Sequence, residues 1–412
     1  MKIWYIHNYT MLPEHGALNR GFYLCKYLKK NGLDPIVFTG SHPHNTKLQL
    51  IKGKEKNQVY QEDPFKWVLI KTRDYEGSKK SRVLSMFEFY WNTIIASKRF
   101  EKPDAIIGSS AHPLAALLAC KLGKKYGCKR IVEVRDLWPE SIVNYGILSR
   151  KNPIIKFLYL FEKYLYTHAD SIVFTMENAW QYIEDRGLSK CIQRKNVYYL
   201  NNGVDLEEFN KNLREYHLDD ADLDDDNSFK IVYVGSIRKA NSIGVLLDAA
   251  KAIKNPKVRL LFWGDGDELD ILRTRIKEEG ISNLILKGRV SKKYIPSIIT
   301  RADINYMHGG NTPIMKYGLS ANKLFDYAAA GKPILTDFKA GHNPADVYQA
   351  GITIDHPTPM RIASIIDEIV NMDAVEYNQY CQNALRLAND YSYQSLAKKM
   401  IQIIESCDKK GK

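Results

Sequence analysis

The chain has 412 residues, 45% of them hydrophobic and 11% aromatic, which is enough for two or three domains with packed cores. It contains no apolar run of about 18 residues, so no transmembrane helix is expected, and Met1–His7 is too short for a signal peptide and predicts a strand. The six cysteines form no C-x-x-C pair and no zinc spacing, a pattern typical of free thiols in a reducing cytoplasm.

The net charge of +13 is concentrated in the first half of the chain. Residues 1–210 hold 32 Lys and Arg against 21 Asp and Glu, whereas the remainder holds 28 against 26. A basic half of this kind favours an anionic partner: a membrane surface, a diphosphate lipid or a nucleic acid. The alternative is that the charge serves only solubility. No recognised nucleic-acid-binding module occurs, so nucleic acid is not an expected partner.

Strand and helix patterns alternate along the chain, which predicts an α/β fold with parallel sheets. The polar residues 41–66 interrupt this alternation and are expected to form a mobile loop. The expected strands include residues 2–6, 35–39, 67–72, 104–108, 130–134, 229–237, 258–263, 302–306 and 333–336.

Loops that lead from a strand to a helix are where α/β folds bind anions, and two such loops in the first half contain candidate residues. The loop Pro13–Ala17 contains His15 and Gly16. His112 follows the strand at residues 104–108, although an isolated histidine in that place is more often structural.

A third loop follows the strand at residues 130–134 and is rich in charge. Arg135, Asp136 and Glu140 are expected to lie together at the same edge of the sheet. Asp136 has an alternative role as a structural cap, because Pro139 is placed to open a helix.

The segment Lys79–Ile95 is predicted to be a helix with two possible roles. Large apolar residues recur at helical spacing at positions 83, 84, 87, 90, 91, 94 and 95. A basic start followed by bulky aromatics suits a helix in a membrane interface. A core helix packed on the sheet is the preferred interpretation.

Residues 211–228 contain a run of acidic residues from Asp219 to Asp226 with little hydrophobic content. The composition predicts a linker. The spacing is not that of a calcium-binding loop, so no metal site is predicted here or elsewhere.

The second half opens with the strand Phe229–Ile237, whose end contains Gly235 and Ser236. Arg238 and Lys239 follow before a helix, and two cations beside a helix start suit a diphosphate. The next strand ends in a G-x-G turn at Gly264 and Gly266, which allows close approach of the backbone to a ligand. No third glycine follows at dinucleotide spacing, which argues against a nicotinamide-dependent oxidoreductase.

The stretch Tyr317–Pro333 predicts a helix that is capped by Ser320 and ended by Gly331. Asn322 and Lys323 lie in its first turn, where free backbone N–H groups, the helix dipole and a cation together suit a phosphate. Asp326, one turn later, can accept hydrogen bonds from sugar hydroxyls. The combination suits a nucleotide sugar; the alternative is a capped surface helix with solvated charges.

The motifs resemble those of glycosyltransferase family 4, which has retaining enzymes of GT-B architecture. The stretch S-x-N-K-L-F-D-Y-x-A-A-G-K-P at residues 320–333 and the string D-L-W-P-E at residues 136–140 are similar to the O-antigen and capsule branch, including L-fucosamine transferase-like proteins. The turn N-G-V-D-x-x-x-F at residues 202–209 resembles the one that closes the first domain of the family. Gly318 stands where much of the family has a second carboxylate, and Ser236 and Asn241 stand at its usual Arg and Lys positions.

The resemblance implies two Rossmann-like domains with parallel sheets facing a central cleft. Residues 1–210 would bind the acceptor and residues 211–392 the nucleotide sugar, and a final helix within residues 393–412 would pack back on the first domain. Catalytic roles are expected for His112, Asp136 and Lys239, and acceptor contacts for His15, His112, Arg135 and Glu140. Donor contacts are expected from Gly16, Gly235, Ser236, Arg238, Lys239, Asn241, Gly264, Gly266, Val290, Ser320, Asn322, Lys323, Leu324 and Asp326.

The function that these expectations describe is a glycosyltransferase without metal or other cofactor. The donor would be a nucleotide sugar, preferably a UDP-linked N-acetylated amino or deoxy sugar such as N-acetyl-L-fucosamine. The acceptor would be a polyprenyl-diphosphate-linked saccharide at the cytoplasmic face of an anionic membrane, in O-antigen, other lipopolysaccharide or capsule synthesis. The alternative is a sugar-nucleotide epimerase or a phosphorylase of the same architecture.

Overall fold

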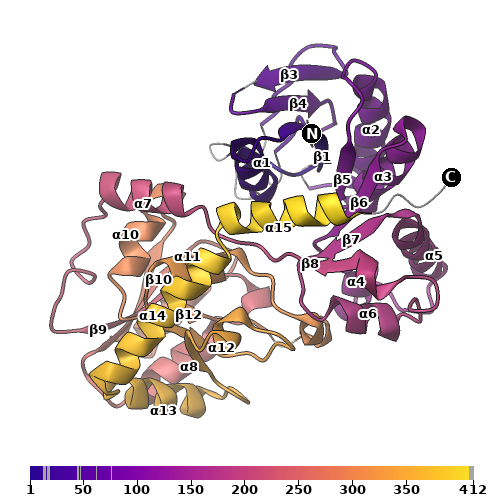
Figure 1. The fold of residues 1–412 in the computed structure, drawn as a ribbon. Coiled ribbons are helices and arrows are strands. Elements are labelled where there is room, and N and C mark those ends of the chain that lie inside the picture. Colours follow the sequence, from indigo (N-terminus) through magenta and orange to yellow (C-terminus); the bar gives the residue numbers. More distant parts are fainter. Residues whose placement is uncertain are drawn as a thin grey trace. The chain divides into compact units, whose positions relative to one another are not determined.

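The computed structural model describes residues 1–12, 15, 19–43, 46, 48–61, 63–75, 77–310 and 312–407, and the chain divides into two compact α/β units (Figure 1). Unit 1 contains Met1–Asn201 and the residues from Tyr393 onward. Unit 2 contains Asn202–Ser392. The alternation of strands and helices in the sequence therefore gives the expected fold class, with one sheet in each unit.

Unit 1 is built on an eight-stranded sheet of order β3-β4-β2-β1-β5-β6-β7-β8. The strands are β1 (Lys2–Ile6), β2 (Asp34–Gly40), β3 (Asn57–Gln61), β4 (Lys66–Ile70), β5 (Ala105–Ser109), β6 (Lys129–Val134), β7 (Ser171–Phe174) and β8 (Val197–Tyr199). All neighbours pair in parallel except β3 and β4. β3 lies within residues 41–66, so the expectation of a loop throughout that stretch is wrong. Its polar sequence is explained by its place at the edge of the sheet, where half of a strand faces solvent.

The helices of unit 1 are α1 (Arg20–Lys30), α2 (Lys79–Ser97), α3 (Pro113–Tyr126), α4 (Glu140–Asn144), α5 (Pro153–His168), α6 (Ala179–Asp185) and α15 (Tyr393–Ser406). The last helix, α15, packs against α1. α3 contacts both α2 and α5. It also lies very close to β5, because a Cβ on Gly108 would come within 2.5 Å of the Ala115 carbonyl oxygen. This close packing fixes the loop that contains His112.

The helix α2 has one face in the core and one on the surface. Phe89 and Tyr90 are buried among residues of β1, β2 and β4, whereas Phe87 and Trp91 are 49% and 60% exposed. Val83, Leu84 and Ile95 are also exposed. The preferred interpretation, a core helix packed on the sheet, is therefore correct for one face of α2, whereas the opposite face carries exposed apolar residues that the sheet does not cover.

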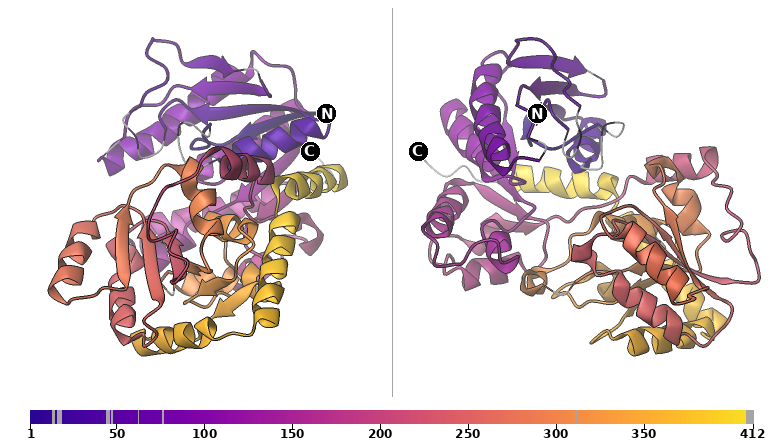
Figure 2. Two further views of the ribbon diagram at one scale, coloured as in Figure 1. Left: turned by 90° about the vertical axis from the view of Figure 1, so that its left-hand side faces the viewer. Right: turned by 180° about the vertical axis from the view of Figure 1, so that it is seen from behind.

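Unit 2 is built on a six-stranded parallel sheet of order β11-β10-β9-β12-β13-β14. Its strands are β9 (Phe229–Val234), β10 (Val258–Trp263), β11 (Leu284–Gly288), β12 (Ile304–Met307), β13 (Ile334–Thr336) and β14 (Gly351–Thr353). Central strands such as β12 are buried along their whole length, as expected where helices lie on both faces of a parallel sheet (Figure 2).

The helices of unit 2 are α7 (Leu206–Glu215), α8 (Gly244–Ala252), α9 (Leu269–Glu278), α10 (Ile295–Thr300), α11 (Asn322–Ala329), α12 (Pro344–Val347), α13 (Pro359–Val370) and α14 (Ala374–Asp390). Residues of α8, α9 and α13 share one hydrophobic core with the sheet, and α11 packs against α14. Among the described residues, no helix combines the length and hydrophobicity that crossing a membrane would need.

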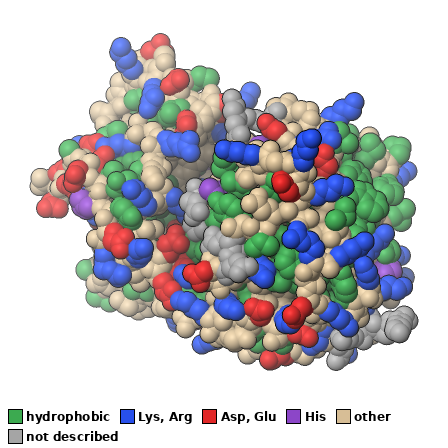
Figure 3. All heavy atoms as spheres, turned by 90° about the horizontal axis from the view of Figure 1, so that it is seen from above, with side chains coloured by type: hydrophobic (Ala, Val, Ile, Leu, Met, Phe, Trp, Pro, Cys, Tyr) green, Lys and Arg blue, Asp and Glu red, His purple; other side chains and the backbone are tan. Residues whose placement is uncertain are grey.

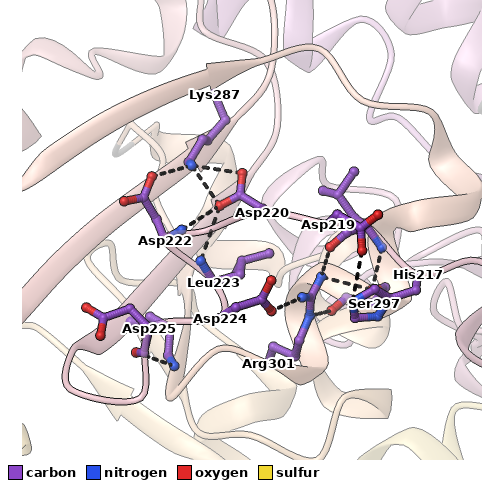
Figure 4. Close-up of polar contacts among 12 residues, drawn as sticks. His217, Asp219, Asp220, Asp222, Leu223, Asp224, Asp225, Lys287, Ser297 and Arg301 are labelled. Carbon is purple, nitrogen blue, oxygen red and sulfur yellow. Dashed lines mark hydrogen bonds and ion pairs between the residues drawn. The ribbon is translucent and has the colours of Figure 1, made fainter.

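Ion pairs and hydrogen bonds hold the acidic stretch before β9 against the rest of unit 2 (Figure 4). Lys287 of β11 donates to both carboxylate oxygens of Asp220, at 2.7 and 2.8 Å, and also to Asp222. Arg301 donates to Asp224 at 2.6 Å, and Leu223 is buried. The prediction of a linker here is wrong, because the pairing cations lie about 65 to 80 residues later in the chain and cannot be seen in the local composition.

Candidate functional site

The order of strands reverses at the centre of each sheet, and the two reversals mark where a ligand is expected. In unit 2 the sheet continues from β9 through β10 to one side and from β12 through β13 to the other. The loops at the carboxyl ends of these two strands therefore lead away from each other, and ligands of doubly wound sheets bind in the crevice that results. In unit 1 the same reversal occurs between β1 and β5.

The start of α11 places Lys323 beside the reversal in unit 2. The Lys323 Nζ atom lies 4.4 Å from the centre of the Tyr233 ring, at the end of β9. Burial lowers the pKa of Lys323 to about 8, although Asp337 acts in the opposite direction. The expected cap is wrong: Ala321 precedes the helix without a side-chain cap, and the Ser320 hydroxyl instead accepts a hydrogen bond from Asn202 at 2.9 Å.

Asp326 lies one turn further along α11 and faces a different loop. Burial raises the pKa of its carboxyl group to about 6, while Lys292, shortly after β11, acts to lower it. Val290 is half-buried in the same loop after β11. Asn322, at the start of α11, is exposed, whereas the Leu324 side chain is fully buried and anchors the helix in the core. The Leu324 side chain is therefore not available to a donor, and the expected donor contact of this residue, through its backbone, stays a prediction.

The loop after β9 is held by its own polar side chains. Asn241 donates to the Ser236 carbonyl oxygen at 2.8 Å and to its hydroxyl at 2.9 Å, and the Tyr233 hydroxyl donates to the same carbonyl at 3.0 Å. These bonds fix the turn that leads into Arg238 and Lys239, whose side chains are exposed. The structure thus brings the two cations to the same strand end as Lys323.

The glycines of this region serve contacts between loops. A Cβ on Gly264 would lie 1.8 Å from the carbonyl oxygen of Gly235, and one on Gly266 would lie 2.1 Å from that of Ile237. The loop after β10 therefore packs directly on the loop after β9. The two glycines are therefore needed for this packing of one loop on the other. The expected donor contact of Gly264 and Gly266 stays a prediction.

Two residues near Lys323 were not among the sequence candidates. His308 follows β12 and Asp337 follows β13, and the His308 Nδ1 atom lies 2.5 Å from the Asp337 carboxylate. Both side chains are almost completely buried. A signal was present in the sequence, because each residue comes within two positions of the end of a predicted strand, but neither belongs to a motif.

In unit 1 the reversal brings His7 and Arg135 together. The Arg135 guanidinium lies 3.1 Å from the His7 Nε2 atom. Burial and the neighbouring charge of Arg135 lower the pKa of His7 well below its ordinary value. His7 directly follows the first strand, which is the signal that would have identified it.

His112 lies at the same edge of the sheet, between two aromatic rings. The ring centroids of Tyr9 and Phe89 are each 5.7 Å from that of His112. Burial, with a contribution from Arg82, lowers the pKa of His112 to about 3, so the ring is neutral at physiological pH. Neither ring nitrogen has a hydrogen-bond partner among the residues described here. A neutral imidazole of this kind can position a substrate but is a weak base.

The charged loop after β6 divides into two environments. The Asp136 carboxylate reaches the surface beside Trp138 and Phe161, and burial nevertheless raises its pKa while Arg135 opposes that change. Asp136 does not cap α4, which begins without a side-chain cap.

Glu140 is used inside unit 1. Its carboxylate accepts hydrogen bonds from the Tyr159 hydroxyl at 2.6 Å and from Asn144 at 3.0 Å, and it pairs with Arg150. The structure therefore gives Glu140 the role of holding α4 against α5. That role differs from the expected contact with an acceptor.

The loop after β1 is described only in part. The His15 Nε2 atom lies 3.1 Å from the Tyr60 hydroxyl of β3. Gly16, the donor-site glycine expected in this loop, lies outside the described residues.

A buried ion pair fixes the floor of the unit 1 site. The Arg20 guanidinium donates to Glu133 at 3.0 Å, and the Tyr5 hydroxyl donates to the other carboxylate oxygen at 2.7 Å. Arg20 also donates to the Leu200 carbonyl oxygen at 3.0 Å, which ties α1 to the end of β8. Burial would raise the pKa of Glu133, but Arg20 and Arg135 lower it to about 2.

Comparison with solved structures identifies the architecture. The chain superposes on Anabaena HepE, solved in complex with UDP, with a TM-score of 0.67 at 12% identity, over 98% of this chain and 100% of that one. WaaG, a glycosyltransferase involved in lipopolysaccharide biosynthesis, gives 0.64 at 13% identity, again over 98% and 100%. The family model for Glycosyltransferase Family 4 matches residues 16–208, and that for Glycosyl transferases group 1 matches residues 218–388. The chain is a GT-B glycosyltransferase.

This glycosyltransferase also has a similar protein in Pseudomonas aeruginosa. The probable glycosyltransferase WbjE is 23% identical over 315 residues, which are 73% of this chain and 75% of WbjE. The GT-B fold inferred from the sequence motifs is confirmed. Each unit of the enzyme has one reversal of strand order, and ligands of doubly wound sheets are expected to bind at such reversals.

The Glu133–Arg20 pair generates a stability prediction for the enzyme. Replacing Glu133 with Gln leaves a buried guanidinium without its counter-charge, which should destabilise unit 1 by roughly 3–5 kcal/mol. Because the folded-state pKa lies below the ordinary 4.5, the native protein gains stability above that value and loses it as pH falls towards 2. Denaturant unfolding at pH 7 and at pH 3 measures both effects.

The matched control is Glu101→Gln, which removes a carboxylate that pairs with Lys2 at the surface. That change should alter stability by no more than about 0.5 kcal/mol. Equal losses in the two variants, or a Glu133→Gln protein that keeps the wild-type acid sensitivity, would show that the buried pair is not what holds unit 1.

Proposed function

We propose that the enzyme transfers a sugar from a nucleotide donor to a lipid-linked saccharide during synthesis of a bacterial surface polysaccharide. The observation that carries this proposal is the placement of Lys323 at the start of α11, over the Tyr233 ring of β9 and within the influence of Asp337 after β13, with Asp326 one turn away. A cation at the start of a helix can bind a diphosphate. A carboxylate one turn further along the helix can accept hydrogen bonds from the hydroxyl groups of a ribose. The solved complexes of HepE with UDP and with UDP-glucose support UDP as the preferred nucleotide.

The donor is proposed to lie across the carboxyl edge of the unit 2 sheet. Its diphosphate would meet Lys323 together with Arg238 and Lys239, its ribose would meet Asp326, and its base would meet the loop that contains Val290. Departure of the diphosphate adds negative charge, which these cations would stabilise. Lys239 is the proposed catalytic cation of the group, and transfer is proposed to retain the configuration at the anomeric carbon without a metal ion.

The acceptor is proposed to bind unit 1 at the reversal between β1 and β5. Arg135 there supplies a positive charge for a polyprenyl diphosphate, and Asp136 and the neutral His112 would position the saccharide hydroxyl. His15 would contribute from the loop after β1. The enzyme is proposed to act in O-antigen or capsule synthesis, with an N-acetylated amino or deoxy sugar as the preferred group. The involvement of the structurally similar WaaG in lipopolysaccharide biosynthesis supports a role in making a bacterial surface polysaccharide.

Unit 1 also offers a surface for an anionic membrane. The exposed apolar side of α2 has a counterpart on α5, where Ile154, Phe157 and Leu160 are 60–68% exposed. Both helices contact α3, which carries exposed lysines at positions 121, 124 and 125. Seen from above, hydrophobic side chains with Lys and Arg around them gather on the right-hand side (Figure 3). Apolar residues bordered by lysines are suited to the interface of a cytoplasmic membrane face.

The direct test is a transfer assay with UDP-sugars and a polyprenyl-diphosphate-linked saccharide, in the presence of EDTA. The donor should be consumed only when the acceptor is present, and EDTA should leave the rate unchanged, because the basic side chains already neutralise the leaving diphosphate. Donor consumption without a lipid acceptor would instead identify an epimerase or phosphorylase. Loss of transfer in EDTA that Mg²⁺ or Mn²⁺ restores would contradict the metal-free mechanism.

The opposite pKa shifts on α11 predict that donor affinity has a maximum between about pH 6 and pH 8. Below the lower value Asp326 is protonated and no longer offers a charged acceptor. Above the upper value Lys323 is neutral and no longer attracts the diphosphate. Calorimetric titration of a UDP-sugar, whose diphosphate does not ionise in this range, across pH 5–9 measures the profile.

Two variants of α11 test the acidic and the alkaline limb of this pH profile separately. Asp326→Ala should weaken donor binding roughly tenfold to hundredfold at neutral pH and abolish the acidic limb. Lys323→Arg should shift the alkaline limb upward, since arginine stays charged. An unchanged affinity in Asp326→Ala would remove that carboxylate from the site.

Membrane binding should depend on the exposed side of α2 and not on its buried side. Replacing Phe87 and Trp91 with Ser should release the protein from anionic vesicles while its melting temperature is kept. Replacing the buried Tyr90 with Ser is the control, and it should destabilise unit 1 by roughly 3–5 kcal/mol. Co-sedimentation with phosphatidylglycerol vesicles at low and high salt measures binding, and wild-type protein that stays in the supernatant at low salt would end the hypothesis.

A further inference from the structure

The pair His308–Asp337 lies at the reversal of strand order in unit 2. His308 directly follows Met307, the last residue of β12, and Asp337 directly follows Thr336, the last residue of β13. Because β12 and β13 are parallel neighbours, their carboxyl ends meet at the same edge of the sheet. The pair therefore lies at the edge where the donor is proposed to bind.

The carboxylate of Asp337 is held by several donors. Besides His308 Nδ1 at 2.5 Å, it accepts a hydrogen bond from the Tyr306 hydroxyl at 3.1 Å and from the backbone N–H of Gly309 at 3.4 Å. Its negative charge also acts on Lys323. These contacts fix the position of the carboxylate, and the carboxylate in turn fixes the orientation of the imidazole ring.

The other ring nitrogen, His308 Nε2, has no hydrogen-bond partner within the described part of the chain. The His308 side chain is only 5% exposed, so bulk water does not replace that partner. Buried polar atoms are nearly always hydrogen-bonded in native proteins, and one left without a partner indicates a missing ligand or water. Asp337 thus fixes the Nδ1 side of the ring, whereas Nε2 lacks a hydrogen-bond partner among the described residues.

A purely structural role explains this arrangement less well. His112 in unit 1 also has unsatisfied nitrogens, but aromatic rings surround it and no carboxylate orients it. His308 has a buried carboxylate on one nitrogen, which is the arrangement that fixes the direction of the second nitrogen toward a bound group. As an imidazolium the ring would donate one hydrogen bond to Asp337 and the other to an anion.

We propose that His308, oriented by Asp337, is a donor-site residue whose Nε2 atom donates a hydrogen bond to a phosphate oxygen of the nucleotide sugar, next to Lys323. The inference rests on the proposed function and assigns a contact within it. His308 and Lys323 would then both donate to the diphosphate at this edge of the unit 2 sheet.

The test uses two replacements of His308, each of which keeps the hydrogen-bonding group of only one ring nitrogen. The amide of Asn reaches about as far as Nδ1, so His308→Asn keeps a donor for Asp337 but removes the distant nitrogen. The longer Gln places its amide near the position of Nε2. His356→Gln is the control, because that histidine lies in the same unit with its side chain 95% exposed.

Calorimetry with the full-length protein should compare UDP with uridine. His308→Asn should weaken UDP binding roughly tenfold to hundredfold and leave uridine binding within about twofold, because only the phosphate contact is lost. His308→Gln should recover part of the UDP affinity, and His356→Gln should match the wild type. Equal affinity for UDP in His308→Asn and the wild type would overturn the proposal, and so would an equal loss for UDP and uridine, which indicates a structural role.

A measurement on the wild type keeps the proposal testable if His308→Asn fails to fold. Long-range ¹H–¹⁵N spectra of ¹⁵N-histidine-labelled protein, assigned with His308→Gln, should show the Nε2 signal of His308 move on addition of UDP or inorganic diphosphate but not of uridine. A signal that stays in place while UDP binds overturns the inference alone. If the wild type binds none of UDP, dTDP, GDP and ADP, the nucleotide-sugar donor fails and this inference fails with it.

Discussion

The reversal of strand order at the centre of each sheet is the constraint on which the candidate sites depend. Right-handed crossover connections place successive helices on opposite faces once the direction of winding changes, so the loops at β1 and β5, and at β9 and β12, separate from each other. The candidates that the structure brings together lie in the loops after these strands and after their neighbours β6 and β13, or on the helix α11. The side chains can act on one ligand because this topology brings them to the same edge of a sheet.

Unit 2 adds a second constraint through the helix α11. Lys323 and Asp326 are opposite charges three positions apart, yet they face different loops and their pKa values are shifted in opposite directions by the same cause, burial. Burial destabilises the charged form of each side chain. An anionic ligand with hydroxyl groups, such as the proposed nucleotide sugar, would supply partners to both side chains.

The sequence allowed the fold class, the strand-end loops and the placement of Lys323 to be predicted, because these depend on local periodicity and on motifs. Contacts between distant segments could not be predicted in this way. Three contacts each join residues at least 29 positions apart: Lys287 with the acidic stretch, Gly264 with the backbone of Gly235, and His308 with Asp337. Ser320 shows the same limit, since its hydroxyl is engaged by Asn202 instead of capping the helix that follows it.

The half-buried ammonium of Lys323 has a consequence for covalent chemistry. Burial lowers the pKa of this side chain to about 8, below the ordinary value for lysine. A lower pKa raises the share of the neutral amine at a given pH, and the neutral amine is the nucleophilic form of lysine. An electrophile attached to an anionic carrier would be brought to this amine if the diphosphate binds as proposed. The burial that lowers the pKa of Lys323 thus also makes it a suitable point of attachment for a label directed at the proposed donor site.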